Sequence, residues 1–137
     1  MKKLLTLALT LVLTLTLALI TACEKEPLVI KESDKYVVIK VETDKTDLTL
    51  ANYMASLEEY KNMFTIENGM VVSINGIKNA SDWSACWMLY TDDYSEENST
   101  SAFTIKYKEK TYNSANYGAE SLIVKDGSTY IWVYQSF

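Results

Sequence analysis

The segment from Gly69 to Tyr90 constrains the fold of this 137-residue chain more than any other. Asn-Gly dipeptides at 68–69 and 75–76 bracket the run 70–74, and after a polar loop the chain becomes apolar again at 87–90. Asn-Gly turns flanked by alternating apolar residues are the strongest short-range sequence signal for β-hairpins. The sequence therefore predicts a small β-rich domain built around a central sheet that contains this segment.

Period-2 alternation of apolar residues predicts further strands at 36–42, 46–48, 63–67, 103–107, 111–112 and 130–134. Within 70–74 we expect Met70, Val72 and Ile74 on one face. In the last strand Ile131 and Val133 face one way, and the aromatic residues at 130, 132 and 134 face the other.

A helix is expected directly after Thr49, whose hydroxyl can accept a backbone N–H at the first turn. Leu50, Tyr53, Met54, Leu57 and Tyr60 then recur at three- and four-residue spacing and form one apolar stripe that covers the sheet. Two stretches are expected as loops. The first, 92–101, is acidic and solvated, and the second, 113–120, includes Gly118 with a positive φ.

The N-terminus has the pattern of an export signal. Two lysines precede an uncharged run over 4–19, and small residues lead to Cys23, as in a bacterial lipobox. We expect residues 1–22 to be a signal peptide, Cys23 to carry lipid, and 23–35 to be a tether. The domain would be 36–137, held outside the cytoplasm on the cell membrane. The alternative is an uncleaved membrane-spanning helix.

The composition argues against several functions. The chain has a net charge of −5, with no histidine and no arginine, so neither nucleic acid nor a phosphate is an expected partner. Without histidine the usual Ser or Cys triads have no base, and enzymatic activity is not expected. The acidic pairs at 92–93 and 96–97 are neighbours on one loop, which favours a solvated surface over a metal site. Cys86 is expected as a small core residue.

The chain resembles a known family at five places, taken in order along the sequence. These are Ser73-Ile-Asn-Gly-Ile77, Cys86-Trp-Met-Leu-Tyr90, Tyr117-Gly-Ala-Glu120, Val124-Lys-Asp-Gly127 and Tyr130-Ile-Trp-Val-Tyr134. Together they are similar to the C-terminal domain of transcobalamin and intrinsic factor and to its bacterial relatives of unassigned function. The resemblance covers 36–137 and implies an α+β fold, with a β-grasp-like mixed sheet crossed by one helix and an added β-hairpin.

In that family the domain closes over cobalamin held mainly by a separate helical domain. The resemblance therefore implies a lipid-anchored ligand-binding module for cobalamin or another corrinoid, acting with a transporter or a helical partner domain. The expected ligand-binding residues lie along a strand and the loop beside it: Trp87, Tyr90, Thr91, Tyr112, Asn113, Ser114, Asn116 and Tyr117.

A second hypothesis comes from the aromatic residues, which are numerous for so small a core. Trp83, Tyr94, Tyr112 and Tyr117 lie on expected loops, where exposed rings suit contact with a protein or a glycan. An aromatic-lined cleft between 87–91 and 113–118 would favour the ligand-binding module. A flat aromatic face at 130, 132 and 134 would favour a surface interaction or adhesion module.

Overall fold

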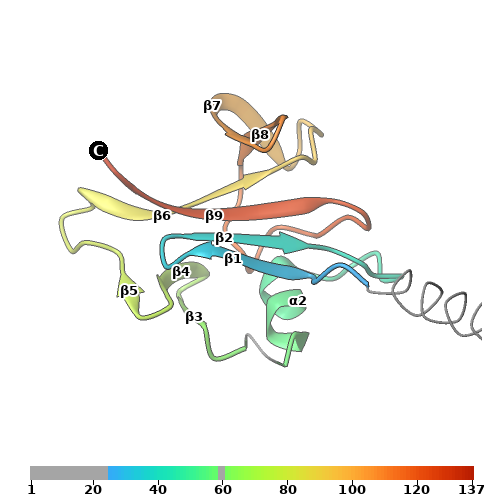
Figure 1. The fold of residues 1–137 in the computed structure, drawn as a ribbon, viewed down its shortest axis with the longest axis horizontal. Helices are drawn as coiled ribbons and strands as arrows, with labels where there is room; N and C mark the ends of the chain where they lie inside the picture. Colours follow the sequence, from blue (N-terminus) through green and yellow to red (C-terminus); the bar gives the residue numbers. More distant parts are fainter. Residues whose placement is uncertain (1–24, 59–60) are drawn as a thin grey trace, which may run out of the picture.

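A computed structural model describes residues 25–58 and 61–137 of the chain. The expected signal peptide and the lipidation residue Cys23 lie outside these ranges. The described chain is antiparallel β-structure with one short helix, an α+β arrangement (Figure 1). In this part of the protein no helix is both long enough and apolar enough to cross a membrane.

The larger sheet has six strands in the order β1-β2-β9-β6-β8-β7. The strands are β1 (Val29–Ser33), β2 (Tyr36–Lys40), β6 (Ala85–Thr91), β7 (Ser99–Tyr107), β8 (Lys110–Ala115) and β9 (Thr129–Ser136). All pairs recorded between these strands are antiparallel, so the expectation of a mixed sheet is wrong. β6 pairs along its whole length with β9, and the two strands form the centre of the sheet.

The first hairpin differs from the expected one. Residues 29–33, assigned from the sequence to the tether, form β1 and pair with β2. The side chain of Val29 is buried in the core. The sequence did not indicate this strand, because its apolar alternation is short and lies next to charged residues. The expected return strand at 46–48 does not form, and Thr49 makes only an isolated bridge with Ile123.

Helix α2 (Leu50–Ser56) begins where the sequence predicts. The Thr49 hydroxyl accepts a hydrogen bond from the backbone N–H of Asn52 at 3.2 Å, which confirms the cap. The helix lies against one face of the large sheet (Figure 1). Its side chains Leu50, Tyr53 and Met54 are buried in the core on that side. The helix ends earlier than its apolar stripe suggested, and Tyr60 lies outside the described residues.

The two Asn-Gly turns form, but their strands lie outside the central sheet. β3 (Phe64–Glu67), β4 (Met70–Ile74) and β5 (Ile77–Lys78) make a separate three-stranded sheet. The core face of β4 also differs from the prediction, because Val71 is buried whereas Met70 is 46% exposed and Val72 is half-buried. Three successive apolar residues at 70–72 leave the inward face ambiguous. The ladder with β3 skips Val72, and this irregularity falls between Val71 and Ile74, the two apolar residues of β4 that are buried in the core.

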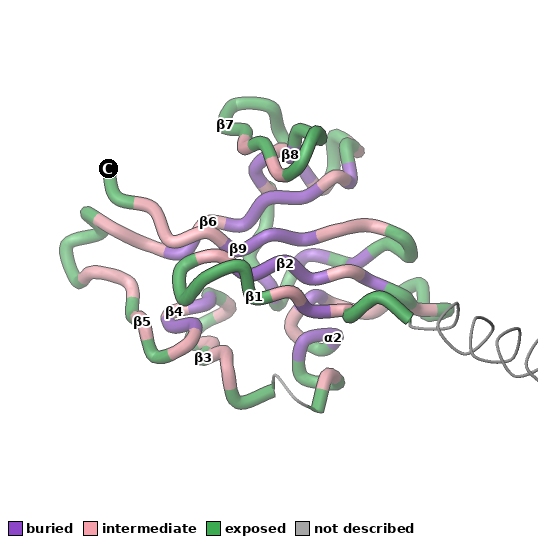
Figure 2. The backbone as a smooth tube through the Cα atoms, viewed as in Figure 1, coloured by how far each residue is buried: buried purple, intermediate pink, exposed green. Residues whose placement is uncertain are grey.

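Two clusters of buried side chains pack on opposite faces of the large sheet. Figure 2 shows the buried residues along β2, β9 and β6. Tyr130 and Trp132 of β9 pack on the helix side, whereas Ile131 and Val133 pack on the opposite side, as the alternation predicted. We call the second cluster, built from Val38, Tyr90, Tyr112 and Ile131 with partly buried neighbours, the outer core.

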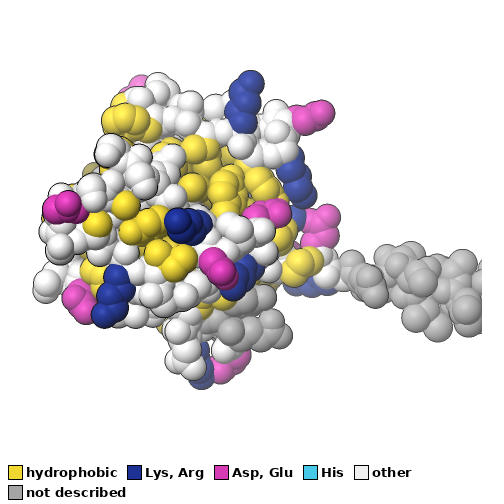
Figure 3. Space-filling view, turned by 60° about the vertical axis from the view of Figure 1, so that its left-hand side comes forward, with side chains coloured by type: hydrophobic (Ala, Val, Ile, Leu, Met, Phe, Trp, Pro, Cys, Tyr) yellow, Lys and Arg dark blue, Asp and Glu magenta, His cyan; other side chains and the backbone are white. Residues whose placement is uncertain are grey.

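The β7–β8 hairpin lies over the outer core, and Figure 3 shows hydrophobic side chains gathered between it and the strands beneath. The added hairpin predicted from the sequence is therefore present, although longer than expected. Because β7 starts at Ser99 and β8 ends at Ala115, both neighbouring loops are shorter than the sequence suggested. The Tyr107 hydroxyl donates to the Glu32 carboxylate and so links β7 to β1, the two edges of the sheet.

Candidate functional site

Most of the ligand-binding residues expected from the sequence are buried. Trp87, Tyr90, Thr91, Tyr112 and Ser114 are all in the protein interior. Asn113 is half-buried within β8, and only Asn116 and Tyr117 are exposed on a loop. The structure therefore does not bring the whole set together as one binding surface.

The buried members have structural partners. The indole Nε1–H of Trp87 donates to the backbone carbonyl of Ile77 at 2.8 Å on the helix side of the sheet. Tyr90 points to the opposite face, where its hydroxyl donates to the side chain of Gln135 at 2.5 Å. Tyr112, expected in a short strand and also among the exposed aromatic residues, is buried in β8, with its ring centroid 6.2 Å from that of Tyr107. Trp87 therefore belongs to the helix-side core, and Tyr90 and Tyr112 belong to the outer core. Successive side chains of a strand point to opposite faces of the sheet, so Trp87 and Tyr90 cannot line the same surface.

A groove nevertheless lies at the edge that the sequence indicated. It has a volume of about 310 Å³ and runs between β6 and the segment 115–118, with β4 at its side. We call it the β6 groove. Its lining is mainly apolar and comprises Met70, Val71, Trp87, Met88, Leu89, Ala115, Asn116, Tyr117, Gly118 and Trp132. Met70 and Tyr117, which are 46% and 49% exposed, form its accessible part.

The groove exists because β8 leaves β6 early. The two strands pair only at Tyr90–Ser114 and Thr91–Asn113. Beyond this point Asn116 is bound by the loop opposite: its backbone N–H donates to Asn98 at 2.9 Å, and its side-chain amide donates to the carbonyls of residues 96 and 97, each at 3.0 Å. These bonds hold the segment 115–118 away from the Trp87–Leu89 part of β6.

Gly118 ties the same segment to the β3–β4 turn. A Cβ atom built on Gly118 would lie 2.6 Å from the carbonyl oxygen of Gly69, closer than real atoms approach. Gly118 does not have the positive φ expected from the sequence, since Gly69, Gly76 and Gly127 are the glycines with positive φ. Glycine is required at 118 because two backbone segments meet there.

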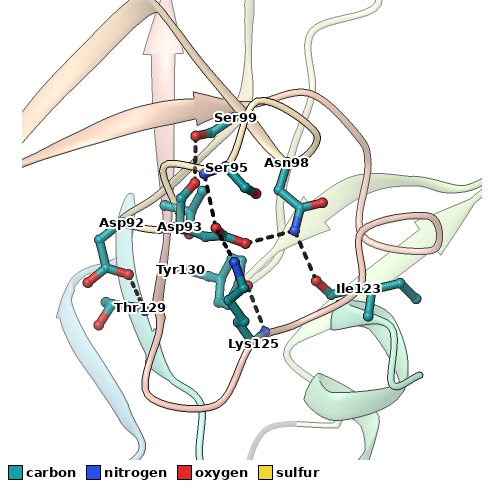
Figure 4. A network of polar contacts seen from close by, with 10 residues as sticks. Asp92, Asp93, Ser95, Asn98, Ser99, Ile123, Lys125, Thr129 and Tyr130 are labelled. Atoms are coloured by element: carbon teal, nitrogen blue, oxygen red, sulfur yellow. Dashed lines mark hydrogen bonds and ion pairs between the residues drawn. The ribbon is translucent and has the colours of Figure 1, made fainter. Parts of the chain in front are cut away.

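A buried polar network holds the loop that binds Asn116 (Figure 4). The Asp93 carboxylate accepts hydrogen bonds from Asn98 Nδ2 at 2.7 Å, Lys125 Nζ at 3.0 Å and the backbone N–H of Ser95 at 3.2 Å. Burial disfavours the charged form, but these donors outweigh it and hold the pKa of Asp93 below its usual value. The expectation of a fully solvated acidic loop is thus wrong at Asp93, which is 4% exposed.

The chemistry of the β6 groove suits binding rather than proton transfer. Tyr117 is its only titratable lining residue, and Asn116 supplies a neutral polar edge. Trp132, 3% exposed, forms part of the lining, and its indole N–H has no hydrogen-bond partner in the described chain. Nearby Cys86 is half-buried, and burial raises the pKa of its thiol, which disfavours the reactive thiolate.

The β6 groove lies between segments that the sequence analysis paired, 87–91 and 113–118, but the residues that shape the groove were not expected. Met70 was expected on one strand face with Val72 and Ile74, and Gly118 was expected on a loop with a positive φ. Asp93 and Asn98 carried no signal, because a buried aspartate in a polar stretch has the same local sequence as an exposed one. Comparison with protein-family models, with curated proteins and with solved structures finds no match to this chain.

Proposed function

We propose that this protein is a lipid-anchored, extracytoplasmic binding module that takes the flat, neutral part of a ligand in the β6 groove. The observation that supports it is an apolar groove formed between β6 and the segment 115–118, where the family resemblance implies the ligand-facing edge. Exposed Tyr117 offers a stacking surface, and Asn116 lies beside it with a neutral polar edge.

The ligand class proposed is a corrinoid, and its source is the resemblance to the transcobalamin and intrinsic factor domain. The order of hairpin, helix and further strands is the one that the resemblance implies, although the sheet is antiparallel rather than mixed. A groove of about 310 Å³ is at the small end of ligand pockets, which span roughly 300–1,000 Å³. It accommodates an edge of a large ligand, so a helical domain or a transporter is proposed to cover the rest.

Titration of the full-length chain in detergent with cobalamin and cobinamide tests the proposal. Binding is expected to be weak without a partner, with a Kd of about 1 μM or higher. Tyr117→Ala should weaken it at least several-fold, whereas Phe103→Ala, which removes a 62% exposed ring on β7, should not. Absence of heat and of tryptophan quenching at about 1 mM ligand would reject the corrinoid assignment.

The anchoring part of the proposal is tested separately at Cys23. Only a thiol at this position can take up the diacylglycerol of a lipobox, so Cys23→Ser should abolish incorporation of labelled fatty acid. Equal labelling of the variant and the wild type would reject the lipoprotein assignment without affecting the groove.

A second candidate function is a surface interaction module. The flat aromatic face that would have favoured it is not exposed, because Tyr130 and Trp132 are buried. Exposed Trp83 and Tyr94 support it instead, each more than half accessible to solvent.

A further inference from the structure

Trp83, in the loop between β5 and β6, has an unusual backbone conformation. Its φ is +61°, and its side chain is 54% exposed. A positive φ is tolerated by glycine and asparagine but is a real strain for a bulky residue. Residues held in strained backbone conformations cluster at active and ligand-binding sites, so the exposed ring of Trp83 is a candidate contact for a ligand.

The loop around Trp83 is closed by its own hydrogen bonds. The Asp82 carboxylate accepts from the backbone N–H of Ser84 at 3.1 Å and from its hydroxyl at 2.7 Å. The backbone N–H of Trp83 donates to Ala80 at 3.0 Å, and that of Ala80 donates to Ala85 at 2.8 Å. These bonds fix the strained residue, so the indole ring is presented by a preorganised loop rather than by a mobile one.

Trp83 borders a groove of about 590 Å³ over the three-stranded sheet, which we call the Trp83 groove. Its lining includes the side chains of Thr65, Glu67, Lys78 and Ser81, and none of these four has a hydrogen bond or ion pair recorded in the described chain. Hydroxyl, carboxylate and ammonium groups therefore stand free beside an exposed aromatic ring. The Trp83 groove and the β6 groove share no lining residue.

We propose that the Trp83 groove binds a neutral oligosaccharide. One face of a pyranose ring presents C–H groups that pack on an indole, while its hydroxyl groups both donate and accept hydrogen bonds. The free side chains match this second requirement, with Glu67 accepting, Lys78 donating and the hydroxyls of Thr65 and Ser81 doing either. One acid and one base balance in charge, which favours a neutral sugar over an anionic one. This inference does not depend on the β6 groove.

The test uses the full-length chain in detergent. The probes are three neutral hexasaccharides: the hexamer of N-acetylglucosamine, the β-1,4-linked hexamer of glucose and the α-1,4-linked hexamer of glucose. The indole N–H resonance of Trp83 is assigned by its loss in Trp83→Phe. With at least one hexamer it should shift saturably at concentrations up to about 10 mM. The resonances of buried Trp87 and Trp132 should stay in place.

Trp83→Gly separates binding from folding. Removal of the ring should reduce saccharide affinity at least 10-fold. Relief of the positive φ should leave Tm unchanged or raise it by roughly 2–4 °C. Ser81→Ala, a smaller change on the wall, should weaken binding two- to five-fold at unchanged Tm. Phe103→Ala and Tyr117→Ala serve as controls and should bind saccharide normally.

Two results would overturn the proposal: no hexamer moves the Trp83 resonance, or Trp83→Gly binds as tightly as the wild type. Loss of saccharide binding in Tyr117→Ala but not in Trp83→Gly would also reject it and would assign the sugar to the β6 groove. A failure of corrinoid titration leaves this test unaffected.

Discussion

At the scale of single residues, Asp93 is a buried carboxylate whose charge is held by three hydrogen-bond donors. Its carboxylate joins the loop at 95–99 to Lys125, and its side chain is 2% exposed. Asp93→Asn keeps the shape but removes the charge that three donors surround. We expect the free energy of unfolding to fall by about 1–3 kcal/mol. Urea denaturation measures this free energy. Glu96→Gln, at an exposed position, is the control and should stay within roughly 0.5 kcal/mol of the wild type.

The same residue predicts an acid dependence. The pKa of Asp93 in the folded state is below the ordinary value of 3.8. Its contribution to stability is therefore complete above pH 3.8 and is lost as the pH falls through the lower, folded value. The difference in stability between wild type and Asp93→Asn should shrink below about pH 4. A difference that stays constant from pH 6 to about pH 2 would contradict the role of the charge.

At the scale of elements, the contact between Gly118 and the β3–β4 turn sets one end of the β6 groove. Gly118→Ala places a methyl group 2.6 Å from the Gly69 carbonyl oxygen, where backbone must move. Destabilisation of about 1–3 kcal/mol is expected, as for overpacked sites. Gly76→Asn is the matched control, since nothing lies within 4 Å of a Cβ there and Asn tolerates its φ of +78°. Equal melting temperatures for the two variants would contradict the close approach.

The orientation of β4 gives a second prediction at this scale. Val71 is 4% exposed and packs in the helix-side core, whereas Val72 is half-buried on the other face. Val71→Ala should cost about 2–3 kcal/mol, because two buried methyl groups are lost and a cavity forms. Val72→Ala should cost less than about 1 kcal/mol. Chemical denaturation of the two variants in parallel measures which valine faces the core. A larger loss of stability in Val72→Ala than in Val71→Ala would support the strand face expected from the sequence.

These elements show which features of the fold can be predicted from the sequence. Asn68-Gly69 and Asn75-Gly76 were predicted as turns, and all four residues have positive φ, because few other dipeptides adopt that backbone so easily. The Thr49 cap and the alternation in β9 were predicted for similarly local reasons. The face of β4 was not predictable, since neighbouring apolar residues satisfy either register.

At the scale of the whole molecule, sheet membership and burial of polar groups depend on contacts between distant segments. β1 and β2 pair across a short turn, but β9 joins them from the other end of the chain. The β6 groove likewise depends on Asn116 and the loop at 96–98 meeting, which no local pattern encodes. The expected ligand-facing segments, 87–91 and 113–118, border the β6 groove, whereas its lining and volume could not be predicted from the sequence, because they depend on these contacts between distant segments.

The outer core makes a prediction for the molecule at alkaline pH. Tyr36, Tyr90, Tyr107 and Tyr112 lie in or against it, and burial raises the pKa of each hydroxyl. For Tyr107, burial together with its hydrogen bond to Glu32 raises the pKa to about 12. A folded-state pKa above the unfolded value of 10.0 means that protonated tyrosine favours folding. Stability is then complete below pH 10 and is lost as the pH rises toward 12.

Spectrophotometric titration of phenolate absorbance checks this directly. In the folded protein part of the absorbance change should occur only above about pH 11, whereas in denaturant all of it should centre near pH 10. Tyr107→Phe serves as the matched control, because it removes the hydroxyl with the largest shift and keeps the ring that packs on Tyr112. Its stability should fall less than that of the wild type between pH 10 and pH 12. Coincident titrations of native and denatured protein would show that the β7–β8 hairpin does not shield the outer core.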